Sequence, residues 1–122
     1  MPEISKDDPL YKFVRLPKAL VSSPMWRGLS PVARAVYIEI AYWYNGTNNG
    51  MLGGSVQFIG KNIGRSKSSA ARGIRELRKV GLIELTREAK FPDVGLASLY
   101  SLAMYKCDVT DRPPKYPFLA QP

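Results

Sequence analysis

Residues 55–83, SVQFIGKNIGRSKSSAARGIRELRKVGLI, read as a short helix, a tight turn, a longer basic helix and an abrupt change into a strand. In the first helix, apolar residues three and four positions apart form a single stripe, consisting of Val56, Ile59 and Ile63. Ser55 can cap the start of this helix, and Gly64 suits a left-handed cap at its end. Gly60 is costly inside a helix, and we expect its bare α-carbon to let another helix cross closely.

The second helix is predicted over residues 67–80, with Ser66 as its cap. Its buried stripe follows from apolar residues at i, i+4 and i+7, which are Ala70, Ile74 and Leu77. The opposite face is polar, mostly cationic and begins with two hydroxyls; its members are Ser68, Ser69, Arg72, Arg75, Glu76 and Lys79. Such a helix can enter a DNA major groove with its N-terminal half against base edges. An ordinary solvated helix could carry the same charges. Groove binding is favoured by the context of the helix, which follows a short helix and a glycine turn and precedes a strand.

The charge of the chain is concentrated around this helix. The 122 residues have a formal net charge of +8, and residues 61–90 hold nine Lys or Arg against three Glu, a balance of +6. A basic balance favours a polyanionic partner. Because the excess gathers on one helix and the strand after it, we expect the partner to be double-stranded DNA.

Another helix is predicted before this stretch. Ser30 and Pro31 are a capping hydroxyl followed by proline at the first helical position, and the helix should run to about Tyr44. One apolar stripe follows its length, made of Ala33, Val36, Tyr37, Ile40, Ala41 and Tyr44. Tyr42 and Trp43 lie off the stripe, where they either pack on the N-terminal segment or contribute to a partner surface. Further upstream, residues 22–24 (SSP) should break a short apolar patch, and Trp26 should belong to the core.

A hairpin is expected after the basic helix. Residues 82–87 and 96–104 read as strands separated by turn chemistry, and residues 51–54 as a short extended segment. Arg87 and Lys90 would lie near the tip of this hairpin. The predicted organisation is a flexible arm (1–12), a folded domain (13–104) and an extended proline-rich tail (105–122) whose Tyr116, Phe118 and Leu119 can dock on the domain or on another subunit.

Composition excludes several functional classes. The chain has one cysteine, Cys107, and no histidine, so neither an internal disulfide framework nor a metal or nucleophile site is expected. We expect no enzymatic activity, no cofactor and no small-molecule ligand. No apolar run is long enough to span a bilayer, and the acidic, polar N-terminus lacks the pattern of a signal peptide. A cytoplasmic protein with no membrane partner is therefore predicted.

The order of helix, extended piece, helix, turn, basic helix and hairpin resembles the winged helix-turn-helix fold, and SKSSAARGIREL (66–77) followed by GLI (81–83) looks like its recognition helix and first wing strand. Further stretches resemble a family of small bacterial helix-turn-helix proteins associated with mobile elements: LPKAL (16–20), SPMWR (23–27), LSPVARAVY (29–37), YNGTNNG (44–50) and CDVT (107–110). The similarity covers about residues 13–118. The sequence departs from this family at Gly53 and Gly54, where larger residues are usual. The resemblance implies a mainly α fold with a small β-hairpin wing, and DNA binding.

Two functional hypotheses follow. The first is sequence-specific binding of double-stranded DNA, by a transcriptional regulator or by a replication or recombination accessory factor. The second is a protein-interaction module that uses Tyr42, Trp43 and the aromatic tail. A homodimer is compatible with the fold, because many such proteins read palindromes, but no sequence feature shows one. The predicted DNA contacts are Lys61, Arg65, Lys67, Ser68, Ser69, Arg72, Arg75, Lys79, Arg87 and Lys90.

Overall fold

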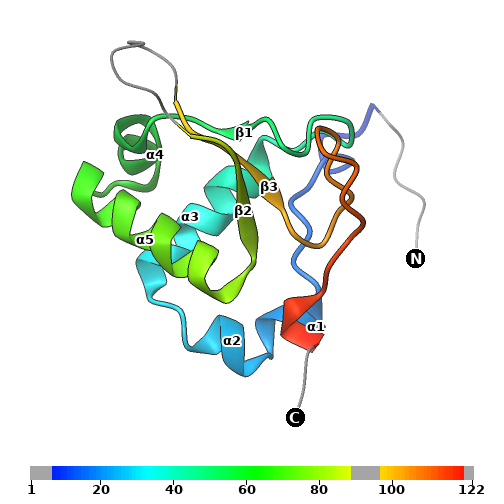
Figure 1. Ribbon diagram of the computed structural model, residues 1–122, viewed down its shortest axis with the longest axis horizontal. Helices are drawn as coiled ribbons and strands as arrows, with labels where there is room; N and C mark the ends of the chain where they lie inside the picture. Colours follow the sequence, from blue (N-terminus) through cyan, green and yellow to red (C-terminus); the bar gives the residue numbers. More distant parts are fainter. Residues whose placement is uncertain (1–6, 89–96, 120–122) are drawn as a thin grey trace.

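A computed structural model describes residues 7–88 and 97–119. Its helices are α1 (Lys18–Val21), α2 (Pro24–Arg27), α3 (Pro31–Tyr42), α4 (Val56–Ile63), α5 (Lys67–Val80) and the 3-10 helix η1 (Pro117–Leu119), and its strands are β1 (Leu52–Gly53), β2 (Ile83–Arg87) and β3 (Leu99–Leu102). Figure 1 shows α4 and α5 side by side, with α3 crossing behind α5 and the sheet beside it. The structure is mainly helical with a small antiparallel sheet, as the winged helix-turn-helix prediction requires.

The sheet has the strand order β1-β3-β2, with both pairs antiparallel. The extended segment before α4 therefore joins the hairpin as its third strand, despite the glycine at position 53. The register between β2 and β3 shifts between Leu85 and Arg87, so Thr86 is an extra residue there. The Thr86 hydroxyl donates a hydrogen bond to the backbone carbonyl of Gly50, just before β1. The second strand of the hairpin is shorter than the predicted 96–104, because residues 103 and 104 already turn away from the sheet.

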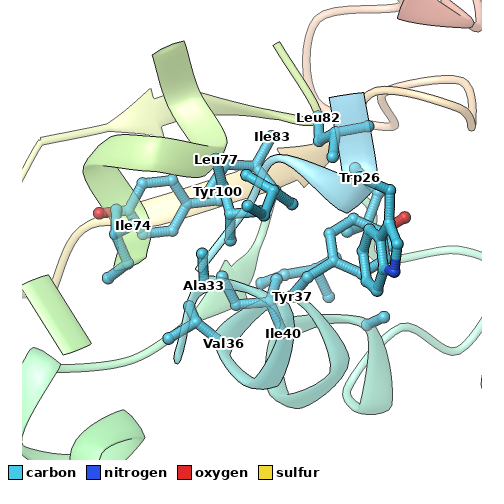
Figure 2. Packing of buried hydrophobic residues seen from close by; sticks show 14 of the residues in the cluster. Trp26, Ala33, Val36, Tyr37, Ile40, Ile74, Leu77, Leu82, Ile83 and Tyr100 are labelled. Atoms are coloured by element: carbon cyan, nitrogen blue, oxygen red, sulfur yellow. The ribbon is translucent and has the colours of Figure 1, made fainter. Parts of the chain in front are cut away.

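The core lies between α3, α5 and the sheet (Figure 2). The predicted stripes are confirmed: the side chains of α3 and α5 that fill the core are Ala33, Val36, Tyr37, Ile40, Ala41, Ala70, Ile74 and Leu77. Trp26 is buried as expected, and its ring meets that of Tyr37 edge to face at 5.5 Å between centroids. Helix α3 ends at Tyr42, two residues before the predicted Tyr44, which is only half-buried.

Two glycines of the helix-turn-helix permit close approaches, but one acts differently from the prediction. A Cβ on Gly60 would lie 2.8 Å from the carbonyl oxygen of Arg65 and 3.0 Å from that of Ser66. The neighbour of Gly60 is thus the backbone of the turn, not a crossing helix. The close helix crossing is at Gly73, where a Cβ would lie 2.9 Å from Cγ2 of Val36 and 3.3 Å from Cα of Ala33 on α3.

The prediction that residues 22–24 break the preceding apolar patch is confirmed, because α1 ends at Val21 and Ser22 caps it. The start of a second helix at these residues was not predicted. Ser23 begins α2: its hydroxyl accepts a hydrogen bond from the backbone N–H of Trp26, and Pro24 occupies the first turn. This is the same serine–proline start that opens α3. The short helix places Trp26 against the core.

The segment after β3 returns along the domain. Phe118 of η1 is buried close to α1 and α2, whereas Tyr116 and Leu119 remain exposed. Arg112 forms an ion pair with Glu84 on β2, and the ammonium of Lys115 lies 3.2 Å from the same carboxylate. Buried Phe118 and the two ion pairs with Glu84 are thus among the contacts that hold the described part of the tail against the domain.

Gly60→Ala should destabilise the fold. Overpacking costs about 1–3 kcal/mol, whereas the better helix propensity of alanine returns about 1 kcal/mol, and here the contact is with backbone that cannot rotate away. We therefore expect a net loss in the free energy of unfolding, measured in urea. Gln57→Ala, at an exposed position of the same helix, is the control and should leave stability nearly unchanged. A variant at position 60 as stable as the wild type would contradict the close approach.

Candidate nucleic-acid interface

Local signals in the sequence fix the geometry of α4, the turn and α5. The Ser55 hydroxyl accepts from the N–H of Phe58, and the Ser66 hydroxyl accepts from the N–H of Ser69. Gly64 and Gly81 both adopt the left-handed conformation, with φ of 72° and 83°. The predicted caps Ser55, Gly64 and Ser66 are confirmed, and Gly81 ends α5 in the same way as Gly64 ends α4. The result is two helices in contact, joined by a turn of three residues.

The outward face of α5 is cationic and open. Lys67, Ser68, Arg72, Arg75 and Lys79 are all exposed. Within residues 7–88 and 97–119, none of these cations forms an ion pair, since every carboxylate in such a pair lies on the hairpin or in the tail. Arginine and lysine side chains without carboxylate partners can exchange hydration water for phosphate oxygens or base edges.

The other predicted cationic contacts lie outside α5. Lys61 lies near the end of α4 and Arg65 lies in the turn, and both are exposed. Arg87 ends β2; its side chain is exposed and its guanidinium donates a hydrogen bond to the carbonyl of Ala97, 2.9 Å away across the hairpin. Lys90 lies outside the described residues.

Two members of the predicted polar face are engaged with the protein. Ser69 is half-buried, and its hydroxyl lies 3.0 Å from that of Ser66. The carboxylate of Glu76 accepts hydrogen bonds from the N–H of Ser30 at 3.0 Å and from the Ser30 hydroxyl at 2.6 Å. These bonds, with a smaller contribution from nearby Arg72, hold the pKa of Glu76 below its usual range. Glu76 is therefore not a free member of the open face of α5, because it is half-buried and bonded to the start of α3.

A cavity of about 250 Å³ lies between α5 and the start of α3. It is lined by Ser30, Val32, Ser69, Arg72 and Glu76. Sequence reasoning found the capping role of Ser30 but not its partner on α5, because no local pattern connects residues 46 positions apart. The one available signal was an acid in an otherwise basic helical face.

The comparison with known families agrees with this geometry. Residues 27–83 match the model of a family described as a helix-turn-helix domain. The match and the structure agree on a helix-turn-helix fold for this stretch. The match runs from the end of α2 to the first residue of β2, and so contains α3, α4 and the recognition helix α5. No curated protein and no solved structure matches the chain significantly. A helix-turn-helix domain suggests DNA binding.

Within the described ranges, no helix is both long and apolar enough to cross a bilayer. The same residues contain no group of three or more His, Cys, Asp or Glu side chains arranged to hold a metal ion. Cys107 is buried and reduced, beside the backbone carbonyl of Asn49.

The cap of the recognition helix can be tested separately from its exposed face. Ser66→Ala removes the acceptor for an otherwise unpaired N–H and should lower the free energy of unfolding by about 1 kcal/mol. Ser68→Ala, two residues later and exposed, should change stability by less than about 0.5 kcal/mol. Chemical denaturation of both variants measures the difference. Equal stabilities would show that the cap is not formed in solution.

Proposed function

We propose that this protein binds double-stranded DNA sequence-specifically, with α5 in the major groove and the hairpin beside it. The observation that carries the proposal is the exposed face of α5, whose cations form no ion pair within the described residues. Two regulatory settings fit this activity: a transcriptional regulator, or an accessory factor in replication or recombination. The resemblance to mobile-element proteins supports a setting of this kind in bacteria.

The residues divide by the kind of contact they can make. Arg72 and Arg75 project from the middle of α5 and suit bidentate contact with guanine. Ser68, near the N-terminus of α5, is exposed and suits contact with a base edge. Ser69 is half-buried and is less accessible for such a contact. The remaining predicted contacts suit phosphates, which position the protein but carry no sequence information. These are Lys61 on α4, Arg65 in the turn, Lys67 and Lys79 on α5, Arg87 at the end of β2, and Lys90.

Selection of bound sites from a random duplex pool tests the proposal. A recovered motif of a few adjacent base pairs supports sequence-specific reading, and its symmetry reports whether one or two copies bind. Mobility shifts with the selected duplex and with mixed duplex DNA then give the specificity ratio. A pool without enrichment would overturn sequence-specific binding.

Arg72→Ala should weaken binding to the selected site by about 1–3 kcal/mol and relax base preference at one position. The reason is the loss of a bidentate contact from an exposed guanidinium that has no ion-pair partner among the described residues. Fluorescence titration against the selected duplex and its single-base variants measures both quantities. Arg27→Ala, an exposed arginine on α2 outside the proposed interface, is the matched control. Unchanged affinity and preference in Arg72→Ala would exclude a base contact from this residue.

Lys61→Ala should weaken binding to all duplexes by a similar factor. If Lys61 neutralises one phosphate, its loss reduces the slope of log affinity against log salt by about 0.9. Titrations at several salt concentrations with selected and mixed DNA measure the slope. Lys106→Ala is a suitable control, since Lys106 lies in the tail and is paired there with Asp111. An unchanged slope in Lys61→Ala would remove Lys61 from the interface.

A second candidate function, protein binding, is favoured by one specific observation. Tyr42, Trp43 and Phe58 form an exposed aromatic cluster. The distance between ring centroids is 5.0 Å for Tyr42 and Trp43 and 6.2 Å for Trp43 and Phe58. Trp43 therefore packs against Phe58 of α4, and Tyr42 packs against Trp43. Because Phe118 is buried in its own domain, this cluster is a better candidate than the tail for contact between two copies. Sedimentation of the wild type and of Trp43→Ala tests for such a dimer, and a wild type that stays monomeric at high concentration would exclude it.

A further inference from the structure

Glu76 connects the recognition helix to the start of α3. Its two carboxylate oxygens accept from the backbone N–H and from the hydroxyl of Ser30. The same Ser30 hydroxyl accepts from the N–H of Ala33 at 3.1 Å and so caps α3. One serine therefore serves both the N-terminus of α3 and a carboxylate on α5.

We propose that Glu76 is a positioning residue for DNA reading: its bond to Ser30 fixes the rotation of α5 about its own axis, and with it the direction of Arg72. This inference rests on the proposed function. Arg72 lies one helical turn before Glu76, so the two side chains share a face. Both line the cavity between α5 and the start of α3.

Apolar packing sets which face of α5 points inward, and the Glu76–Ser30 contact adds a directional polar restraint beside that face. Helices α5 and α3 approach closely at Gly73, where a Cβ would lie 2.9 Å from Cγ2 of Val36. The Glu76–Ser30 hydrogen bonds lie at the wall of the cavity and join α5 directly to the start of α3. A charge-assisted pair of hydrogen bonds is directional, and it defines an angle that nonspecific packing does not.

The same contact accounts for an acid on a basic helix. A carboxylate projecting toward DNA would repel phosphates and reduce affinity for every sequence. Turned toward Ser30, the carboxylate is neutralised in part by two donors and by the partial positive charge at the N-terminus of α3. Two roles can therefore be separated by experiment, because a repelling charge and a positioning residue predict opposite effects of removing Glu76.

The test compares Glu76→Ala with Glu84→Gln. Glu84 lies on the hairpin in ion pairs with Arg112 and Lys115, so its substitution removes one negative charge without touching α5. With the positioning role, Glu76→Ala loses about tenfold in affinity for the selected duplex, keeps or gains affinity for mixed DNA, and yields a relaxed motif in a repeated selection. Glu84→Gln keeps the wild-type motif.

Two further variants make the result independent of charge and of misfolding. Glu76→Gln retains an oxygen acceptor for Ser30 and should recover much of the specificity. Ser30→Gly carries no change of charge, retains the backbone donor and is a nearly equivalent helix cap, yet should lose part of the specificity. Circular dichroism confirms that each variant is folded before titration.

Tighter binding of Glu76→Ala to selected and mixed duplexes alike, with the motif unchanged, would overturn the positioning role and leave the proposed function intact. Wild-type protein that selects no duplex motif would overturn the proposed function, and the positioning role with it.

Discussion

The contact of α5 with α3 at Gly73 is the constraint on which the rest of the structure depends. The missing side chain lets the two backbones approach, and the buried residues on either side of it, Ala70, Ile74 and Leu77, close the core. Once this stripe faces inward, helical geometry sends Arg72 and Arg75 outward. Core packing and a cationic outer face are thus two consequences of one helix orientation.

Local chemistry made most of the fold predictable. Caps such as Ser55 and Ser66 and terminators such as Gly64 and Gly81 act within a few residues, so their sequence signals survive in the structure. The stripes of α3 and α5 were also predictable, because helical periodicity is written directly in the sequence. The start of α2 at Ser23 was not predicted, although Ser23 opens α2 in the same way that Ser30 opens α3.

Contacts between distant residues were not predictable. Asn49, in what the sequence shows only as a turn, is fully buried; its side-chain amide donates to the carbonyls of Leu102, Tyr105 and Lys106, and its side-chain oxygen accepts from the N–H of Leu102. The same limit applies to Glu76, whose partner is 46 residues away. Charged side chains on a helix are assigned to solvent by periodicity alone, and only the fold shows which of them are used internally.

The central claim is that α5 occupies the major groove, and protection of guanine N7 from methylation tests it most directly, since N7 is accessible only in that groove. On the selected duplex, the account predicts that bound protein protects N7 of guanines within the motif and that methylating them beforehand blocks binding. Full reactivity of every motif guanine in the saturated complex, with binding unaffected by prior methylation, would contradict it.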